Sequence, residues 1–294
     1  MAARRLLRLV AAVALVPAAS ACTAVSDEER LQVVASFYPL AWVAQEVGGD
    51  RVTVTDLTPP GGEAHDATLT AGQRVDVQTA DVVLLLGRFG FQPDLERVAG
   101  EASGMVVDVT EGLQLRAAEG GLDYDPHIWL DPILLSEVTR TLADALAEAD
   151  PGSHDGYERR EADLLDELDE LDRELAEGLS GCAYPTFLAT HEAFGYLASR
   201  YGIGQLGLRG IAPESEPTGT RLTEATRAIA DGDAGPVVFA EATAEGRRIA
   251  EGFAGRLQLP VHELSALESA PEAGDYLSVM RENLDALREG LECI

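Results

Sequence analysis

Three of the five histidines in the sequence stand at the ends of predicted strands or just before a predicted helix. His65 comes after a strand predicted over 52–57, and His191 directly follows one predicted over 184–190. His127 lies in a rigid turn, Asp-Pro-His-Ile-Trp-Leu-Asp-Pro, just before a helix. Ligands of open α/β sheets bind beyond the carboxyl ends of the strands, so we expect these imidazoles to converge. Three imidazoles with an oxygen atom or a water molecule make a tetrahedral zinc site, whereas the simpler alternative is three capping or hydrogen-bonding histidines.

Acidic residues lie close to the predicted ligands. Glu241 ends a predicted strand over 237–240 and is a further candidate ligand. Three other acids could orient the imidazoles by hydrogen bonds, or could simply belong to an acid-rich surface: Glu63, Asp66 and Glu192.

The composition excludes several other kinds of chemistry. The chain has 294 residues, and its 51 acids and 22 bases give a formal charge of −29. Such a surface repels phosphate backbones, so we expect no nucleic-acid partner. Every base is Arg, which excludes mechanisms that depend on a Lys Schiff base or on the Lys of a P-loop.

The elements that would position these residues alternate between apolar runs and helical periodicity. Strands are predicted over 31–37, 52–57, 82–86, 105–109, 184–190, 205–211, 237–240 and 261–264, and helices over 39–47, 132–149, 192–201, 220–230, 243–257 and 276–291. This alternation predicts the α/β class, with two similar lobes built on mostly parallel sheets. We expect the amino-terminal lobe over 31–150 and the carboxy-terminal lobe over 181–294.

Residues 151–180 have a different pattern, because leucines at helical spacing stand among charged residues: Leu164, Leu168, Leu171 and Leu175. The spacing predicts one long amphipathic helix of about 35 Å. We interpret it as a rigid connection between the lobes. A short coiled coil with a partner helix is the alternative.

The first residues are typical of an export signal. Residues 1–21 contain a basic start, a short apolar run and small residues, and Cys22 follows directly, as at a bacterial lipoprotein cleavage site. We therefore expect a lipid anchor on Cys22, a tether over 22–30, and a location on the outer face of the cytoplasmic membrane. Ordinary cleavage near Ala21 with an incidental thiol is the alternative. No later segment has the uninterrupted apolar length of a transmembrane helix.

Two cysteines remain beyond the anchor, Cys182 and Cys293. They lack the spacing of a metal site, and an even pair in an exported chain predicts a disulfide bond rather than two buried thiols.

Three motifs together resemble the zinc/manganese solute-binding lipoproteins of bacterial ABC importers: Asp-Pro-His-Ile-Trp-Leu-Asp-Pro at 125–132, His-Glu-Ala-Phe-Gly-Tyr-Leu at 191–197 and Gly-Asp-Tyr-Leu-Ser-Val-Met at 274–280. The resemblance implies two α/β lobes joined by a long helix and one transition-metal ion between them. It also implies a binding protein rather than an enzyme, which delivers its ion to an ABC permease with an ATPase. We expect it to act as a monomer with a small lobe adjustment.

The resemblance assigns His65, His127 and His191 as the first three ligands. Manganese-type members commonly have a carboxylate at the third position, so His191 favours zinc over manganese. The family's usual Asp at the fourth position is replaced by Ser265. We expect Glu268 or a water molecule to complete the site, with Glu241 as the other candidate.

Rival functions stay open at this point. A manganese- or iron-type receptor or an adhesin could use the same fold. An exported zinc hydrolase, with Glu192 or Glu241 as general base, could use three histidines and an open position. The sequence contains neither His-Glu-x-x-His nor Gly-x-Ser-x-Gly, which disfavours the hydrolase. For a zinc receptor, affinity should fall as the histidines protonate below about pH 6.5.

Overall fold

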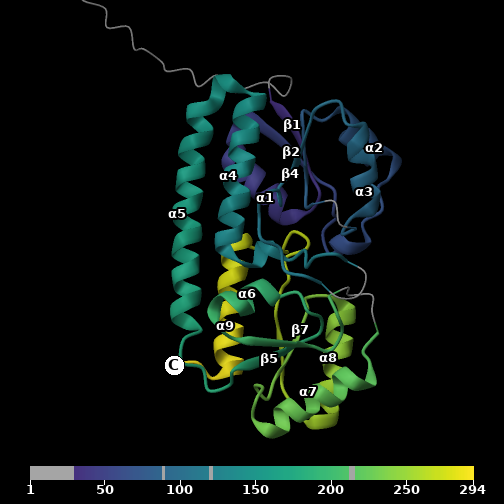
Figure 1. The fold of residues 1–294 in the computed structure, drawn as a ribbon, viewed down its shortest axis with the longest axis vertical. Helices are drawn as coiled ribbons and strands as arrows, with labels where there is room; N and C mark the ends of the chain where they lie inside the picture. The colour runs from purple at the N-terminus through teal and green to yellow at the C-terminus, as the bar shows by residue number, and fades with distance from the viewer. Residues whose placement is uncertain (1–29, 88–89, 119–121, 212–215) are drawn as a thin grey trace, which may run out of the picture.

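The computed structural model describes residues 30–87, 90–118, 122–211 and 216–294, apart from the side chain of Asp66. The predicted leader, Cys22 and all but the last residue of the tether lie outside these ranges. Within them the chain forms two lobes, stacked along the long axis of the molecule in Figure 1.

Each lobe is built on a four-stranded sheet in which every pair of neighbouring strands is parallel. The amino-terminal sheet has the order β2-β1-β3-β4, and its strands are β1 (Leu31–Ala35), β2 (Val52–Asp56), β3 (Val82–Leu85) and β4 (Met105–Asp108). The carboxy-terminal sheet has the order β6-β5-β7-β8, and its strands are β5 (Thr186–Ala189), β6 (Gly204–Gly207), β7 (Val238–Ala240) and β8 (Val261–Glu263). The two sheets therefore repeat one topology, and the prediction of two similar parallel α/β lobes is confirmed.

Helices cover these sheets and connect them: α1 (Tyr38–Gly48), α2 (Ala71–Thr79), α3 (Pro93–Val98), α4 (Pro132–Ala149), α5 (His154–Gly178), α6 (Gly195–Tyr201), α7 (Gly219–Asp231), α8 (Ala244–Leu257) and α9 (Tyr276–Leu291). Helix α4 has the predicted bounds, because Pro132 opens it and the Asp131 side chain accepts hydrogen bonds from the next backbone amides. Sequence reasoning missed α2, which buries only Val77 and so lacks an apolar face.

The helix predicted over 192–201 begins later, at Gly195. The intervening residues instead bond to the neighbouring strand region. The backbone amide of Glu192 donates to the Gly210 carbonyl, and that of Phe194 donates to the side chain of Gln205. Tertiary contacts thus replace the first predicted turn of this helix.

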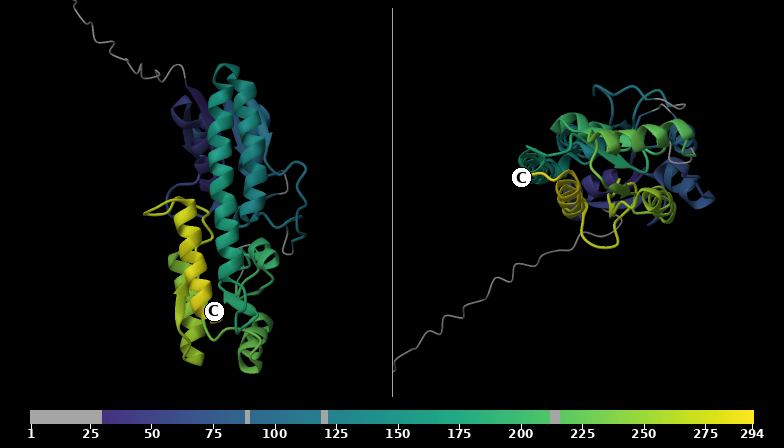
Figure 2. Two further views of the ribbon diagram at one scale, coloured as in Figure 1. Left: turned by 90° about the vertical axis from the view of Figure 1, so that its left-hand side faces the viewer. Right: turned by 90° about the horizontal axis from the view of Figure 1, so that it is seen from below.

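Helix α5 runs beside both lobes, as Figure 2 shows. It contacts α1 and α4 in the amino-terminal lobe and α9 in the carboxy-terminal lobe. Its leucine stripe is buried in these contacts: Leu164, Leu168, Leu171 and Leu175. At about 1.5 Å per residue its 25 residues span about 37 Å. The long connecting helix is confirmed, and its apolar face is occupied within the chain itself.

The lobes also contact each other directly near the centre of the molecule. Trp42 stacks on Tyr276, with ring centroids 4.8 Å apart, and the Tyr276 hydroxyl donates to the Trp129 carbonyl at 2.5 Å. The indole nitrogen of Trp129 donates to the carbonyl of Ala266 at 2.7 Å. One apolar core includes all these rings and the leucines of α5, so the lobes are packed as one unit.

Two further features concern the cysteine pair and the helices. The sulfur atoms of Cys182 and Cys293 are paired where the chain after α5 meets the end of α9. Within the described residues, every helix is too short or too polar to cross a lipid bilayer.

Candidate metal centre

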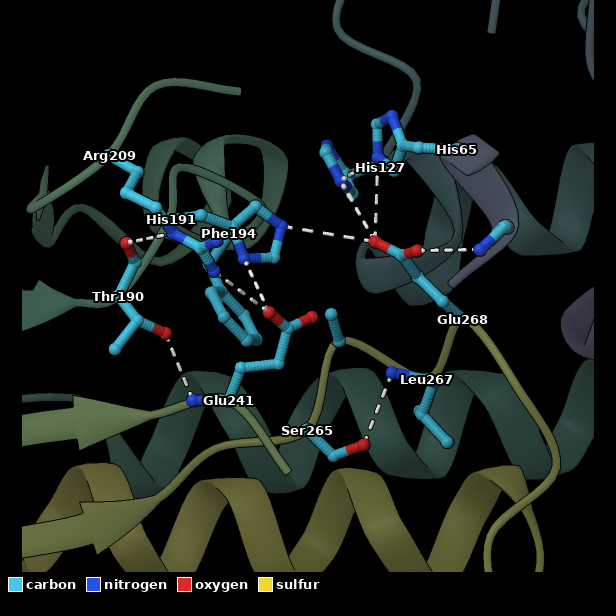
Figure 3. Close-up of polar contacts among 12 residues, drawn as sticks. His65, His127, Thr190, His191, Phe194, Arg209, Glu241, Ser265, Leu267 and Glu268 are labelled. Atoms are coloured by element: carbon cyan, nitrogen blue, oxygen red, sulfur yellow. Dashed lines mark hydrogen bonds and ion pairs between the residues drawn. The ribbon is translucent and has the colours of Figure 1, made fainter. Parts of the chain in front are cut away.

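Four side chains meet where the two lobes face each other, two from each lobe (Figure 3). His65 lies on a short 3-10 turn (Ala64–Asp66) after β2, and His127 immediately precedes another (Ile128–Leu130) that leads into α4. His191 lies two residues after β5, and Glu268 lies in the loop after β8. All four follow the carboxyl ends of parallel strands, which explains why residues so distant in sequence come together.

The carboxylate of Glu268 is the common point of this cluster. Its Oε1 atom lies 3.4 Å from Nε2 of His65, 3.7 Å from Nε2 of His127 and 3.9 Å from Nε2 of His191. The Nε2 atoms of His65 and His127 are 3.3 Å apart. Ligand atoms at tetrahedral zinc bond lengths are about 3.3 Å from one another, so the observed spacing suits a shared ion.

Potential ligands in the described residues form two groups, His65–His127–Glu268 and His191–Glu241–Glu268. Within each group the ligand atoms lie within 4.8 Å of one another. Glu268 is the member that the groups share. Its carboxylate therefore links the histidines of the amino-terminal lobe to the histidine of the carboxy-terminal lobe.

The cluster is almost completely buried. His127 and His191 are 0% and 1% exposed, and Glu268 is 5% exposed. Nε2 of His191 and Oε1 of Glu268 have no hydrogen-bond partner in the part of the chain that the structure describes. A buried polar atom without a partner costs about 1–3 kcal/mol, and a cation between these atoms would remove that cost.

Each buried imidazole has a carboxylate behind it. Nδ1 of His127 lies 2.8 Å from Oδ1 of Asp125, and Nδ1 of His191 lies 3.1 Å from Oε2 of Glu241. Such contacts favour a proton on Nδ1 and so leave the Nε2 lone pair to face the centre. The other oxygen of Glu268 accepts a hydrogen bond from the Ala64 backbone amide at 3.0 Å.

These contacts shift the pKa values of the side chains in the cluster. Complete burial lowers the pKa of His127, but the hydrogen bond to Asp125 and the nearby carboxylate of Glu268 outweigh burial and raise it to about 9. Burial raises the pKa of Glu268, but the positive charge of the neighbouring imidazoles outweighs burial and holds it well below its usual range. Burial, with the nearby charges of Glu241 and Glu268, raises the pKa of Glu63 to about 7.

The remaining residues that the sequence suggested as ligands or as supports of the imidazoles either make other contacts or lie outside the description. Ser265 uses its hydroxyl to accept from the Leu267 backbone amide at 3.2 Å, away from the imidazoles (Figure 3). Glu192 pairs with Arg221 at 2.5 Å instead of orienting an imidazole. The side chain of Asp66 lies outside the described residues.

Sequence reasoning missed the role of Asp125, although the residue belongs to the quoted turn motif. Its Oδ1 atom also accepts from the His127 backbone amide at 3.1 Å. An acid two residues before a histidine in a proline-containing turn could have revealed this contact. The part played by Glu241 had no such local signal.

A family model for the zinc-uptake complex component A, periplasmic, matches residues 33–290. The chain is similar to the high-affinity zinc uptake system protein ZnuA of Bacillus subtilis, with 26% identity over 90% of this chain and 89% of ZnuA. It is also similar to the zinc-binding lipoprotein AdcA of Streptococcus pneumoniae, with 28% identity over 88% of this chain but only 56% of AdcA.

Solved structures give the same result. The Zn(II)-bound ZnuA-like domain of AdcA superposes with a TM-score of 0.76 and 28% identity, over 90% of this chain and 99% of that domain. The laminin-binding protein Lmb of Streptococcus agalactiae, described as a bifunctional protein with adhesin and metal-transporting activity, has a TM-score of 0.81 and 29% identity, over 89% of this chain and 99% of Lmb.

Proposed function

The chain belongs to the family of periplasmic A components of zinc-uptake complexes, and from this premise we propose which of its side chains hold the ion. The family consists of solute-binding receptors that work with ABC permease and ATPase components, and zinc is the ligand that they bind. The protein captures zinc outside the cytoplasm and delivers it to an ABC permease.

His65, His127 and His191 bind the ion through Nε2, and Glu268 binds it through Oε1. The observation that carries this assignment is the approach of three Nε2 atoms to one buried carboxylate oxygen at 3.4–3.9 Å. Zinc loses its water shell on entry, and the imidazoles lose any proton from Nε2 as it binds.

Glu268 supplies the carboxylate of the site, and Ser265 does not, because its hydroxyl accepts from the Leu267 amide. Glu268 is tied to the amino-terminal lobe through the Ala64 amide, so its oxygen already faces the histidines. Glu241 contacts Nδ1 of His191, on the side opposite Nε2, and this placement favours support of the imidazole over ligation.

A site with three nitrogen ligands and one oxygen ligand selects zinc over manganese, which prefers oxygen ligands. Four protein ligands also fill a tetrahedral site and leave no position for the water molecule that a zinc hydrolase requires. The proposed ligand set is therefore that of a carrier rather than a catalyst.

We also propose that Cys22 carries the lipid that anchors the protein to the outer face of the cytoplasmic membrane. The layout of residues 1–22 and the lipoprotein name of the AdcA relative support this assignment. In the oxidising environment outside the cell, Cys182 and Cys293 form a disulfide bond, which their proximity supports. The receptor acts as a monomer.

The test is metal analysis of the purified mature chain, as wild type and as His127→Ala, with zinc and manganese in competition. The wild type should retain one zinc ion per chain, and the variant should lose it. His154→Ala is the matched control, because His154 is 54% exposed at the start of α5. Stoichiometric zinc in His127→Ala would reject the site, and manganese in the wild type would reject the zinc assignment.

A further inference from the structure

A charged cluster lies behind His191 in the carboxy-terminal lobe. Arg209 follows β6, Thr190 and His191 follow β5, and Glu241 follows β7. Because these strands are neighbours in the order β6-β5-β7, the residues that follow them meet at one edge of the sheet. Arg209 and Glu241 are 2% and 6% exposed, so the cluster is buried together with the imidazole.

The Glu241 carboxylate lies between two groups, which its Oε2 atom faces at ion-pair distance and without a hydrogen bond among the described residues. Its Oε2 atom lies 3.7 Å from Nη2 of Arg209 on one side and 3.1 Å from Nδ1 of His191 on the other. Thr190 fixes both charged residues, because its carbonyl accepts from Nε of Arg209 at 3.3 Å and its hydroxyl accepts from the Glu241 amide at 3.0 Å. Figure 3 shows this arrangement around His191.

We propose that Arg209 is a positioning residue of the metal centre: its guanidinium holds Glu241 against Nδ1 of His191 and so keeps Nε2 directed at the ion. The inference rests on the proposed function, because it needs His191 to be a ligand. A buried carboxylate is costly unless hydrogen bonds or an opposite charge compensate it. Arg209 provides that charge from a planar group that is itself bonded to the backbone.

The amino-terminal lobe offers a matched contrast. Nε of Arg116 lies 3.9 Å from Oδ2 of Asp125, the carboxylate behind His127, but the Arg116 side chain is 46% exposed. Asp125 is also held by the backbone amide of His127 within its own turn. An exposed ion pair contributes little, so Arg116 should matter far less than Arg209.

The experiment is a double-mutant cycle on the full mature chain, with zinc affinity measured by competition with a chelator. Arg209→Met should weaken zinc binding about tenfold, within the range known for residues behind metal ligands. Glu241→Gln should weaken it at least as much. The double variant should match Glu241→Gln alone, because Arg209 acts through Glu241. Arg209→Lys should recover part of the loss, and Arg116→Met should change affinity by less than about twofold.

A purely structural role for Arg209 gives different results. Arg209→Met would then weaken binding by the same factor with Glu241 or with Gln at position 241, and that additivity would overturn the proposal. Unchanged zinc affinity in Arg209→Met would overturn it as well. If Arg209→Met does not fold, the cycle is run with Arg209→Lys, where a loss confined to the Glu241 background supports the proposal and an equal loss in both backgrounds rejects it.

The same series separates this inference from the site assignment. His191→Ala tests the ligand directly, and wild-type zinc affinity in that variant would reject His191 as a ligand whatever Arg209 does. A large loss in His191→Ala, together with additive effects of Arg209→Met and Glu241→Gln, would leave the site intact and reject only the positioning role.

Discussion

The two lobes share one strand order but hold their buried histidines in different ways. In the amino-terminal lobe, Asp125 supports His127 from two residues away and bonds to both its ring and its backbone amide. In the carboxy-terminal lobe, Glu241 supports His191 from a neighbouring strand, and Arg209 supports Glu241 from the strand on the other side. The first arrangement is local, whereas the second exists only when the sheet has formed.

This difference assigns separate tasks to the lobes. A short turn with two prolines can fix His127 before the ion arrives, because the hydrogen bonds between Asp125 and His127 lie within three residues of the chain. The position of His191 depends on the packing of three neighbouring strands, so it is fixed only after β6, β5 and β7 have paired. Glu268 joins the two arrangements, since its oxygens reach the histidines of both lobes and the Ala64 amide.

The largest effect should follow from removal of this shared ligand. Among the described residues, only the Glu268 carboxylate contacts imidazoles from both lobes, so in Glu268→Ala zinc affinity should fall by more than about 100-fold, beyond the range for supporting residues. Ser265→Asp in the same chain should not restore it, because the Ser265 side chain is directed away from the imidazoles. Chelator competition measures both variants. Recovery by Asp at position 265 would show that the ion lies nearer to position 265 than the assignment of Glu268 requires.

The pH dependence of zinc affinity should show the effect of Asp125 on the pKa of His127. Its pKa is raised to about 9 in the metal-free chain, so at neutral pH the ion must displace a proton. Zinc affinity should therefore rise by up to about tenfold per pH unit from pH 7 and level off near pH 9, higher than the value of about 6.5 expected for a free histidine. The stability of the metal-free fold depends on pH in the opposite direction. The raised pKa stabilises the metal-free fold below about pH 6.5, and this contribution is lost as the pH rises through 9.

Affinity measured at several pH values, with proton release measured by calorimetry in two buffers, tests this expectation. In Asp125→Asn the rise should end closer to pH 6.5, because the variant lacks the carboxylate that raises the pKa of His127. A wild-type affinity that is flat between pH 7 and pH 9 would contradict the protonated state of His127.

Substitution of the supporting carboxylates compares the two arrangements directly. At pH 9, where a proton on His127 no longer competes with zinc, Asp125→Asn should bind zinc about tenfold more weakly than the wild type, at the lower end of a 10–100-fold range, because the turn still holds its amide oxygen against His127. Glu241→Gln loses the charge that pairs with Arg209 and should fall towards the upper end, about 100-fold. Zinc affinities of the two variants, measured under the same conditions, test this order. A greater loss in Asp125→Asn would mean that local support carries more of the binding than the sheet does.

The same division explains how much could be predicted from the sequence. The bounds of α4 follow from Asp131 and Pro132, and the turn around His127 follows from its prolines, because the signals lie within a few residues. The convergence of three histidines followed from their places after strands. These features depend on local pattern and on a general rule of parallel sheets.

Non-local contacts account for what the sequence left open. The contact between Glu241 and Nδ1 of His191 depends on β5 and β7 being neighbours, which no local pattern reveals. Glu268 was one candidate among several, and the contact that orients it comes from the Ala64 amide in the other lobe. Helix α6 begins at Gly195 for the same reason, because contacts with the region of β6 occupy the preceding residues.

Substitution of the cysteine pair should have the smallest effect on zinc affinity, although it should lower the stability of the fold considerably. Cys182 and Cys293 are 111 residues apart, and a bridge of that size contributes about 4–5 kcal/mol in chain-entropy estimates. The double variant Cys182→Ser/Cys293→Ser should therefore unfold in less denaturant, while its zinc affinity at 25 °C changes by less than about twofold, because the bridge contacts none of the ligands. Denaturant titration of the metal-free chain and chelator competition measure the two effects. A parallel loss of zinc affinity would show that support of His191 extends from the strand ends to the far end of the carboxy-terminal lobe, whereas His127, which Asp125 supports within one turn, would keep its geometry.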